Sequence, residues 1–270
     1  MSSAGEALAP RFTFASLTDI GKVRRHNEDF LGDPRSMSAF TGDLKGGSRL
    51  GWLFAVADGM GGHADGEVAS RVAIEALFAS YYASAEEPHL ALAGAMAAAN
   101  VAVCRAAERS GQPSSSRSRM GTTLVTAVLG GPRIVVGNVG DSRAYLLLNG
   151  RLSQVTQDHS FVAEQVQLGV MTAQEGRRAP LRNVLTRALG SEEGVMPDLF
   201  EVPWGTGGVL LLCTDGLHGV VEDRMIEAVL AAEPPERAVR RLIDAANAAG
   251  GPDNISAIVV RADGASERRP

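Results

Sequence analysis

Short apolar runs recur along the chain, and several of them end in an aspartate followed by a small residue. The run Leu53–Ala57 leads into Asp58, and the run Val209–Thr214 leads into Asp215. A short, uniformly apolar run predicts a buried strand. A carboxylate at the end of such a strand is costly to desolvate, so it needs a partner cation, a cage of hydrogen bonds or a raised pKa.

The same construction occurs twice more. Ile134–Gly140 leads into Asp141, and Asp253 stands just before the apolar run Ile255–Val260. These aspartates recur at predicted strand ends with almost no His or Cys nearby. Such an all-oxygen set is typical of a site for a hard cation such as Mg²⁺ or Mn²⁺.

The hydrophobic pattern also predicts the order of the elements. We expect strands at 12–18, 53–58, 121–129, 134–139, 142–148, 151–155, 209–213 and 255–261, and helices at 66–84, 88–109, 222–232 and 235–249. Asn149-Gly150 between two apolar runs predicts a tight hairpin, so residues 121–155 are interpreted as an antiparallel meander. The uniformly apolar 209–213 predicts a central strand covered on both faces. Strands grouped apart from helices favour an α+β fold with antiparallel sheets.

Two segments between these elements have a different character. Residues 32–49 are rich in Gly, Ser and charge and predict a loop. Residues 157–190 turn to helical and loop patterns between strands, which makes them a candidate flap. We expect one domain over 12–262, with residues 1–11 and 263–270 as disordered tails.

Composition narrows the class of protein. The 270 residues carry a net charge of −5 with 45% hydrophobic content, which argues against nucleic-acid and membrane-surface partners. No apolar run approaches the length of a membrane span, and no export signal is present, so we expect a cytoplasmic monomer. The two cysteines, Cys104 and Cys213, fit small buried hydrophobic positions better than a redox site.

The segment from Arg24 to Asp29 carries a further candidate site. It combines two arginines with the adjacent acids Glu28 and Asp29. Arginine clamps oxyanions and carboxylates bind hard metals or their waters, so both functions are available within a few residues. The alternative interpretation is a solvated charged loop without a specific role.

Six motifs appear together and in order. They are Arg24 with Asn27-Glu28-Asp29, Ala57-Asp58-Gly59-Met60-Gly61-Gly62-His63 with Gly66-Glu67, Gly121-Thr122-Thr123, Gly140-Asp141-Ser142-Arg143, Thr214-Asp215-Gly216 and Gly251-Pro252-Asp253-Asn254. Over about residues 12 to 261 the chain resembles the bacterial form of the metal-dependent serine/threonine protein phosphatases, the PPM or type 2C family. The resemblance implies a four-layer sandwich of two antiparallel β-sheets flanked by α-helices.

The resemblance also implies roles for individual residues. Asp58 would bridge two Mn²⁺ or Mg²⁺ ions, the Gly59 carbonyl would bind one of them, Asp215 and Asp253 would complete the other, and Glu28 and Asp29 would act through metal-bound waters. Asp141 with Asp215 would form a third, weaker metal site. Arg24 would bind the substrate phosphate, with Arg25 as a solvated neighbour, and His63 would be the general acid. The reaction would be hydrolysis of phosphoserine or phosphothreonine in proteins by a water or hydroxide that bridges two ions, opposing a bacterial serine/threonine kinase.

Several alternatives remain open from the sequence. A Gly-Gly-His turn is often structural, so His63 is weighed equally as an acid and as a turn residue. Asp141 could bind metal or merely cap its own turn. His159 and His218 are interpreted as structural or substrate-facing. The competing functions are a binding scaffold that has lost activity, although no metal aspartate is missing, and a two-metal hydrolase of small phosphate esters.

Overall fold

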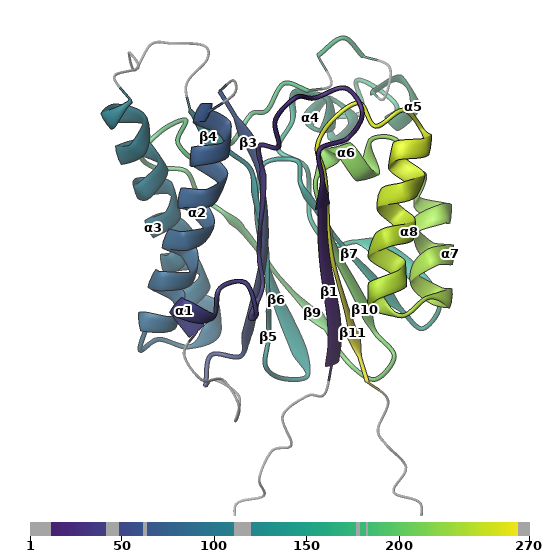
Figure 1. Ribbon diagram of the computed structural model, residues 1–270, viewed down its shortest axis with the longest axis horizontal. Coiled ribbons are helices and arrows are strands. Elements are labelled where there is room, and N and C mark those ends of the chain that lie inside the picture. Colours follow the sequence, from purple (N-terminus) through teal and green to yellow (C-terminus); the bar gives the residue numbers. More distant parts are fainter. Residues whose placement is uncertain are drawn as a thin grey trace, which may run out of the picture.

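Two antiparallel β-sheets pack face to face at the centre of the molecule (Figure 1). The computed structural model describes residues 12–41, 49–61, 64–110, 120–176, 179–181 and 183–263. The first sheet has the order β1 (Phe12–Asp19), β11 (Ile255–Ala262), β10 (Val209–Cys213), β7 (Arg143–Leu148) and β8 (Arg151–Gln154). The second has the order β2 (Asp29–Gly32), β3 (Trp52–Met60), β5 (Leu124–Leu129), β6 (Arg133–Val139) and β9 (Asp198–Pro203), with β4 (Gly121–Thr122) beside the end of β3.

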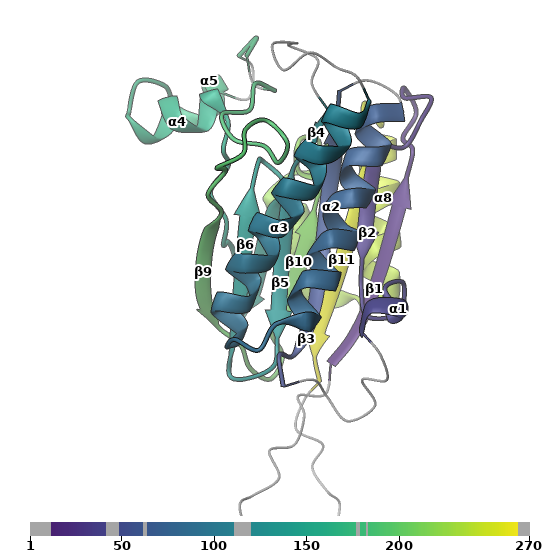
Figure 2. The same cartoon turned by 90° about the vertical axis from the view of Figure 1, so that its left-hand side faces the viewer.

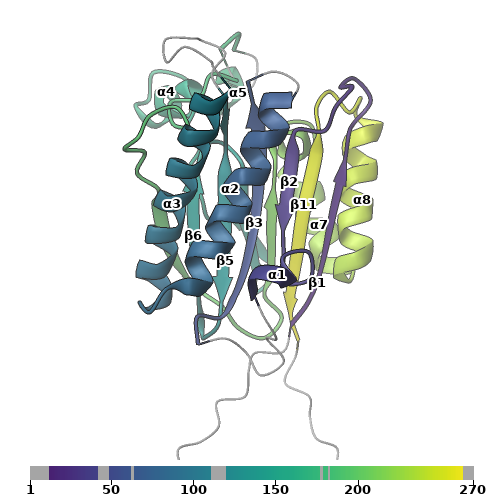
Figure 3. The same ribbon diagram turned by 60° about the vertical axis from the view of Figure 1, so that its left-hand side comes forward.

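Helices cover the outer face of each sheet. The second sheet is covered by α2 (Ala64–Ala83) and α3 (Pro88–Arg109), and the first by α7 (Asp223–Ala232) and α8 (Pro235–Ala248) (Figures 1 and 3). Four shorter helices are α1 (Ser38–Thr41), α4 (Phe161–Gln167), α5 (Ala173–Gly176) and α6 (Asp215–His218). The arrangement confirms the four-layer α+β sandwich expected from the sequence.

The core has three parts because each sheet buries both of its faces. On β10, Leu210 and Leu212 point into the cluster between the sheets, while Leu211 and Cys213 point into the cluster beneath α7 and α8. A strand that is covered on both faces needs apolar residues at every position. This confirms the prediction for 209–213, and Cys104 and Cys213 are both free and buried.

The sequence predicts no apolar run that approaches the length of a membrane span, but the helix α3 reaches that length. Within the described residues, it is the one helix that is long and apolar enough to cross a membrane by length and composition. Its inner face, with Leu92, Met96 and Val103, is buried in the cluster shared with α2 and the second sheet. Burial of this face is what a core helix requires, since apolar area removed from water stabilises the fold.

The predicted meander over 121–155 is wrong. β5 and β6 form a hairpin in the second sheet, but β7 pairs with β10 in the first, so the chain changes sheets between β6 and β7. The Asn149-Gly150 hairpin is confirmed, with φ of 53° and 76° as a type I′ turn requires. The strand β9 has no counterpart among the predicted strands, and the predicted loop 32–49 includes the single turn α1.

The candidate flap 157–190 projects beyond one end of the sandwich and carries α4 and α5 (Figure 2). Ser160 caps α4, and Thr172 and Glu175 hydrogen-bond reciprocally at the start of α5. Isolated β-bridges join Ser160 to Leu185 and Leu189 to Thr122. The first bridge joins the two ends of the segment to each other, and the second fastens its C-terminal end to β4 of the sandwich. The expected tails lie outside the described residues, apart from Asp263.

Replacement of Leu212 by alanine should destabilise the fold by about 2–5 kcal/mol, because its side chain is fully buried between the sheets. Chemical denaturation measures the loss. Leu168→Ala is the matched control, since Leu168 is 73% exposed and should change stability by less than about 0.5 kcal/mol. Equal losses for the two variants would contradict this packing.

Candidate active site

The motif aspartates gather at one end of the sandwich, where β3 and β10 end and the β1–β2 loop crosses over them (Figure 1). Strand pairing sets Asp29 on β2 directly opposite Asp58 on β3. The Thr214 hydroxyl donates a hydrogen bond to Asp29 Oδ2 at 2.9 Å, which joins the second sheet to the end of β10. Asp215 follows as the first residue of α6, and the Asp58 carboxyl lies close enough to influence its pKa.

Four of these carboxylates have strongly raised pKa values. Burial is the main cause in each case, and the negative charges of neighbouring aspartates add to it. The pKa rises to about 7 for Asp29, to about 6 for Asp215 and to about 8 for Asp141, and that of Asp58 lies well above its ordinary value. A bound cation would offset both the cost of burying these charges and the repulsion between them.

The donor atoms fit a hard divalent cation. Among the described residues, Asp29 Oδ1 and Asp215 Oδ1 are buried side-chain oxygens without a hydrogen-bond partner. A buried carboxylate oxygen left unpaired is costly, so both atoms suit an ion. No three His, Cys, Asp or Glu side chains in the described part of the chain lie close enough together to hold a metal by themselves. Mg²⁺ and Mn²⁺ also accept backbone carbonyls and waters, which would complete the ligand set.

Two glycines let three backbone segments meet beside Asp58. A Cβ atom on Gly59 would collide with the carbonyl oxygen of Gly66, and one on Gly66 would collide with the carboxylate of Glu28. The Glu28 carbonyl accepts hydrogen bonds from Gly59 N at 3.1 Å and from Ser70 Oγ at 2.6 Å. Glu28, the end of β3 and the start of α2 are therefore in direct contact, and only glycine permits this approach.

Arg24 stands at the rim of the aspartate cluster. Its Nη2 donates a hydrogen bond to Asp253 Oδ2 at 2.6 Å, and its side chain is 50% exposed. Partial burial opposes the charge of Arg24, but the charges of Asp253, Glu28 and Asp58 outweigh it and raise the pKa. Arg25 is exposed beside it. Of the two arginines, Arg24 is thus the one that the acids hold at the site.

Asn254 is a positioning residue to which the sequence assigned no role. Its Nδ2 donates to the carbonyls of Ile20 and His26, both at 2.9 Å, and its Oδ1 accepts from Glu28 N at 2.8 Å. One side chain thereby fixes both ends of the loop that carries Arg24. An amide side chain offers two N–H donors and a carbonyl acceptor together, as these three bonds require, and its place next to Asp253 in a motif was the available signal.

Two threonines hold Asp58 from the opposite side. Thr123 Oγ1 accepts a hydrogen bond from Asp58 N at 3.0 Å, and Thr122 Oγ1 donates one to Asp58 O at 2.8 Å. Thr123 Oγ1 is also hydrogen-bonded to Ser142 Oγ at 2.8 Å. The motif Gly121-Thr122-Thr123 had no predicted role, and the structure uses it to fix the backbone of Asp58.

The remaining predicted residues have different environments. His63 lies outside the described residues. Arg143 makes a bidentate ion pair with Asp158, so it is held within the fold rather than directed to the aspartates. Burial lowers the pKa of His159 and of His218, the latter to about 3, and both imidazoles are hydrogen-bonded inside the protein. Asp141 lies between β6 and β7, where the chain passes from the second sheet to the first. The charge of Asp215 contributes to the raised pKa of Asp141.

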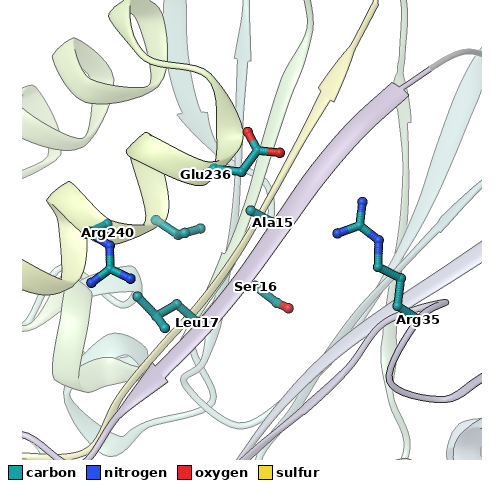
Figure 4. Close-up of a pocket in the computed structure, with 7 residues that line it drawn as sticks. Ala15, Ser16, Leu17, Arg35, Glu236 and Arg240 are labelled. Atoms are coloured by element: carbon teal, nitrogen blue, oxygen red, sulfur yellow. The ribbon is translucent and has the colours of Figure 1, made fainter.

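A separate groove of about 290 Å³ lies along β1 (Figure 4). It is lined by Ser16 and Leu17 of that strand, by Arg35 on one side and by Glu236 and Arg240 of α8 on the other. It contains none of the motif aspartates and is not part of the candidate site.

Comparison with known proteins identifies the same family. Residues 43–259 match the model of the protein phosphatase 2C family. The serine/threonine phosphatase stp of Listeria monocytogenes is 36% identical over 252 residues, which cover 91% of this chain and 94% of that protein. The serine/threonine protein phosphatase PstP of Mycobacterium tuberculosis is 37% identical over 91% of this chain, but the match spans 44% of PstP.

Solved structures agree with these matches. The crystal structure of the Mycobacterium tuberculosis phosphatase PstP superimposes with a TM-score of 0.80 at 35% identity, covering 95% of this chain and all of that one. The PstP catalytic domain in complex with two manganese ions gives a TM-score of 0.78 at 34% identity over 93% of this chain and 98% of that one. The chain therefore belongs to the protein phosphatase 2C family, and it is a metal-dependent serine/threonine protein phosphatase.

Proposed function

We propose that the aspartates at the end of the sandwich hold the divalent ions on which this phosphatase depends. The observation that carries the proposal is the group of four raised carboxyl pKa values, in a cluster where Asp29 and Asp215 each keep a buried oxygen without a partner among the described residues. Either bound protons or divalent cations can offset the charge of these carboxylates, and near neutral pH a divalent cation binds them in preference to protons.

Individual roles follow from the family resemblance and from these surroundings. Asp58 would be a ligand of both main Mn²⁺ or Mg²⁺ ions, the Gly59 carbonyl a ligand of one, and Asp215 and Asp253 ligands of the other. Glu28 and Asp29 would act through waters of the ions. Asp141 and Asp215 would provide a third, weaker site.

Arg24 binds the phosphoryl group of the substrate. Asp253 engages its Nη2, so other N–H groups of the half-exposed guanidinium are directed toward solvent at the rim. A guanidinium can donate two parallel hydrogen bonds to a phosphate. The ion pair with Asp253 holds Arg24 beside the aspartates before the substrate arrives, which lowers the entropy lost on binding.

When bound, two divalent ions lower the pKa of a water molecule and offset charge on the phosphoryl oxygens. The chain itself contributes the fixed carboxylates and the guanidinium around the phosphate. Both cysteines are buried, and burial raises the pKa of the Cys213 thiol, so neither suits a covalent mechanism. His63 remains the candidate donor of a proton to the leaving alcohol.

The finer biological assignments are also proposals. The substrates are phosphoproteins made by a serine/threonine kinase, because that reaction produces the phosphate esters this class of enzyme hydrolyses. The acidic net charge of −5 opposes binding to nucleic acid or to a membrane surface, and the location that we propose is the cytoplasm, with the protein as a monomer.

Asp58→Asn and Asp215→Asn should each reduce turnover of a phosphothreonine peptide by about a hundredfold or more, since loss of metal ligation removes several kcal/mol of transition-state stabilisation. Exposed Asp244→Asn is the matched control and should have near-normal activity. Rates with the peptide and with p-nitrophenyl phosphate should be compared. Normal turnover in either site variant would refute the assignment, and preference for the small ester would favour a different hydrolase.

Removal of metal should make stability depend on pH. The pKa values of Asp29, Asp141 and Asp215 are raised in the fold, so between about pH 4 and about pH 8 the folded state binds more protons than the unfolded state. Their contribution to stability is therefore lost as pH rises. Mn²⁺ replaces these protons, so the Tm gained from Mn²⁺ over EDTA should increase from about pH 5 to about pH 8. A gain in Tm that is constant with pH would contradict a metal at these carboxylates. The buried His159 and His218 affect the Tm equally in Mn²⁺ and in EDTA, so their contribution cancels when the two Tm values are subtracted.

Arg24→Ala should lower kcat/KM for a phosphothreonine peptide by about 10- to 100-fold, because hydrogen bonds to a charged group contribute about 1.5–3 kcal/mol. Arg25→Ala changes a solvated charge and should alter kcat/KM by less than about threefold. Steady-state kinetics of both variants at one ionic strength provide the comparison. Equal losses would remove Arg24 from the phosphate site.

A further inference from the structure

The turn Gly140-Asp141 lies where the chain leaves one sheet and enters the other. Pairing of β6 with β5 ends at Val139, and pairing of β7 with β10 begins at Arg143. No ladder of either sheet therefore fixes Asp141. Other hydrogen bonds have to determine where its carboxylate lies relative to Asp215.

His159 holds the first residue of this turn through both its main chain and its side chain. Its backbone N donates to Gly140 O at 2.9 Å, and its Nδ1 accepts from Gly140 N at 3.1 Å. Since an N–H can only donate, Nδ1 carries no proton, and Nε2–H donates to Asp198 Oδ2 at 3.0 Å. Arg187 binds the other oxygen of Asp198 at 2.7 Å and so fixes that carboxylate. The imidazole is thus held at both nitrogens, by Gly140 N and by Asp198.

His218 holds the second residue of the turn. Its Nε2 lies 3.0 Å from Asp141 O, and because a carbonyl only accepts, Nε2 carries the hydrogen. His218 is the last residue of α6, the helix that begins at Asp215. The bond therefore links the main chain of Asp141 to the short helix that presents Asp215.

The turn has little room to adjust without these bonds. Gly140 has φ of +103°, and a Cβ atom there would collide with the side chain of Thr123. Thr123 in turn accepts the hydrogen bond from Asp58 N. A displacement of the turn would therefore move Asp141 directly, and it would shift Asp58 through Thr123.

We propose that His159 and His218 are positioning residues, which hold the main chain of Gly140-Asp141 so that the Asp141 carboxylate meets Asp215 and sets the affinity of the third metal site. The proposal rests on the proposed role of Asp141 as a ligand. Neither imidazole is proposed as a ligand of the ion. Partners that orient a ligand typically change metal affinity by about 10- to 100-fold when they are lost.

The geometry gives a crossed set of conservative variants. Asparagine at 159 keeps an acceptor near the position of Nδ1 but cannot reach Asp198, whereas glutamine reaches Asp198 and loses the acceptor for Gly140 N. At 218, glutamine keeps an N–H near the position of Nε2, and asparagine falls short of Asp141 O. The two positions therefore require opposite substitutions.

The experiment measures the Mn²⁺ dependence of phosphothreonine-peptide turnover, together with Mn²⁺ binding by calorimetry, in full-length protein. His159→Gln and His218→Asn should weaken the third site by about tenfold or more, with the two stronger sites unchanged. His159→Asn and His218→Gln should remain within about threefold of the wild-type protein. The positioning role would be overturned if the same substitution, Asn or Gln, were the less harmful one at both positions. It would also be overturned if the loss of Mn²⁺ affinity in each variant simply followed its loss of Tm.

Asp141→Asn separates this proposal from the one on which it rests. If that variant loses the weak calorimetric site while the crossed histidine variants do not follow the expected order, the ligand role stands and the positioning role is overturned. If Asp141→Asn leaves Mn²⁺ binding and turnover unchanged, Asp141 is a turn residue and the positioning role is overturned with it. Asp58→Asn tests the two main ions independently of both.

Discussion

The burial of several carboxylates close together is the constraint on which the aspartate end of this protein depends. Asp29 and Asp58 are opposed by strand pairing, and Asp215 and Asp141 approach them from the other sheet. Their raised pKa values express first the free energy of burying these charges and then the repulsion between them. The sandwich can hold them because its three hydrophobic clusters stabilise the strands on both faces. A divalent cation at the site proposed above would offset the free-energy cost of burying these charges together.

The positions of these carboxylates are set by a network of neutral hydrogen-bonding groups. Thr122 and Thr123 fix the backbone of Asp58, Thr214 fixes the side chain of Asp29, and Asn254 fixes the loop that carries Arg24. None of these side chains carries charge, so the network orients the acids without neutralising them. This division of roles leaves the negative potential of the acids uncompensated while limiting the movement of their carboxylates.

The sequence predicted the long helices and the central strand well, because their apolar periodicity is strong and local. It failed where pairing partners decide the structure. The meander over 121–155 followed from continuity of the strands along the chain, yet β7 pairs with β10 because burial of both sheet faces outweighs adjacency in sequence. The edge strand β9 is only half buried, and its apolar and polar residues alternate weakly, so its sequence pattern did not predict a strand.

By itself, the sequence determined the fold class, the family and the aspartates, since apolar runs ending in acids and ordered motifs are properties of the chain alone. Only the tertiary structure decided which groups act on those aspartates. The contacts of Asn254 with Ile20 and His26, and of His218 with Asp141, join residues far apart along the chain. Such contacts depend on the packing of two sheets, and no local pattern of polarity encodes them.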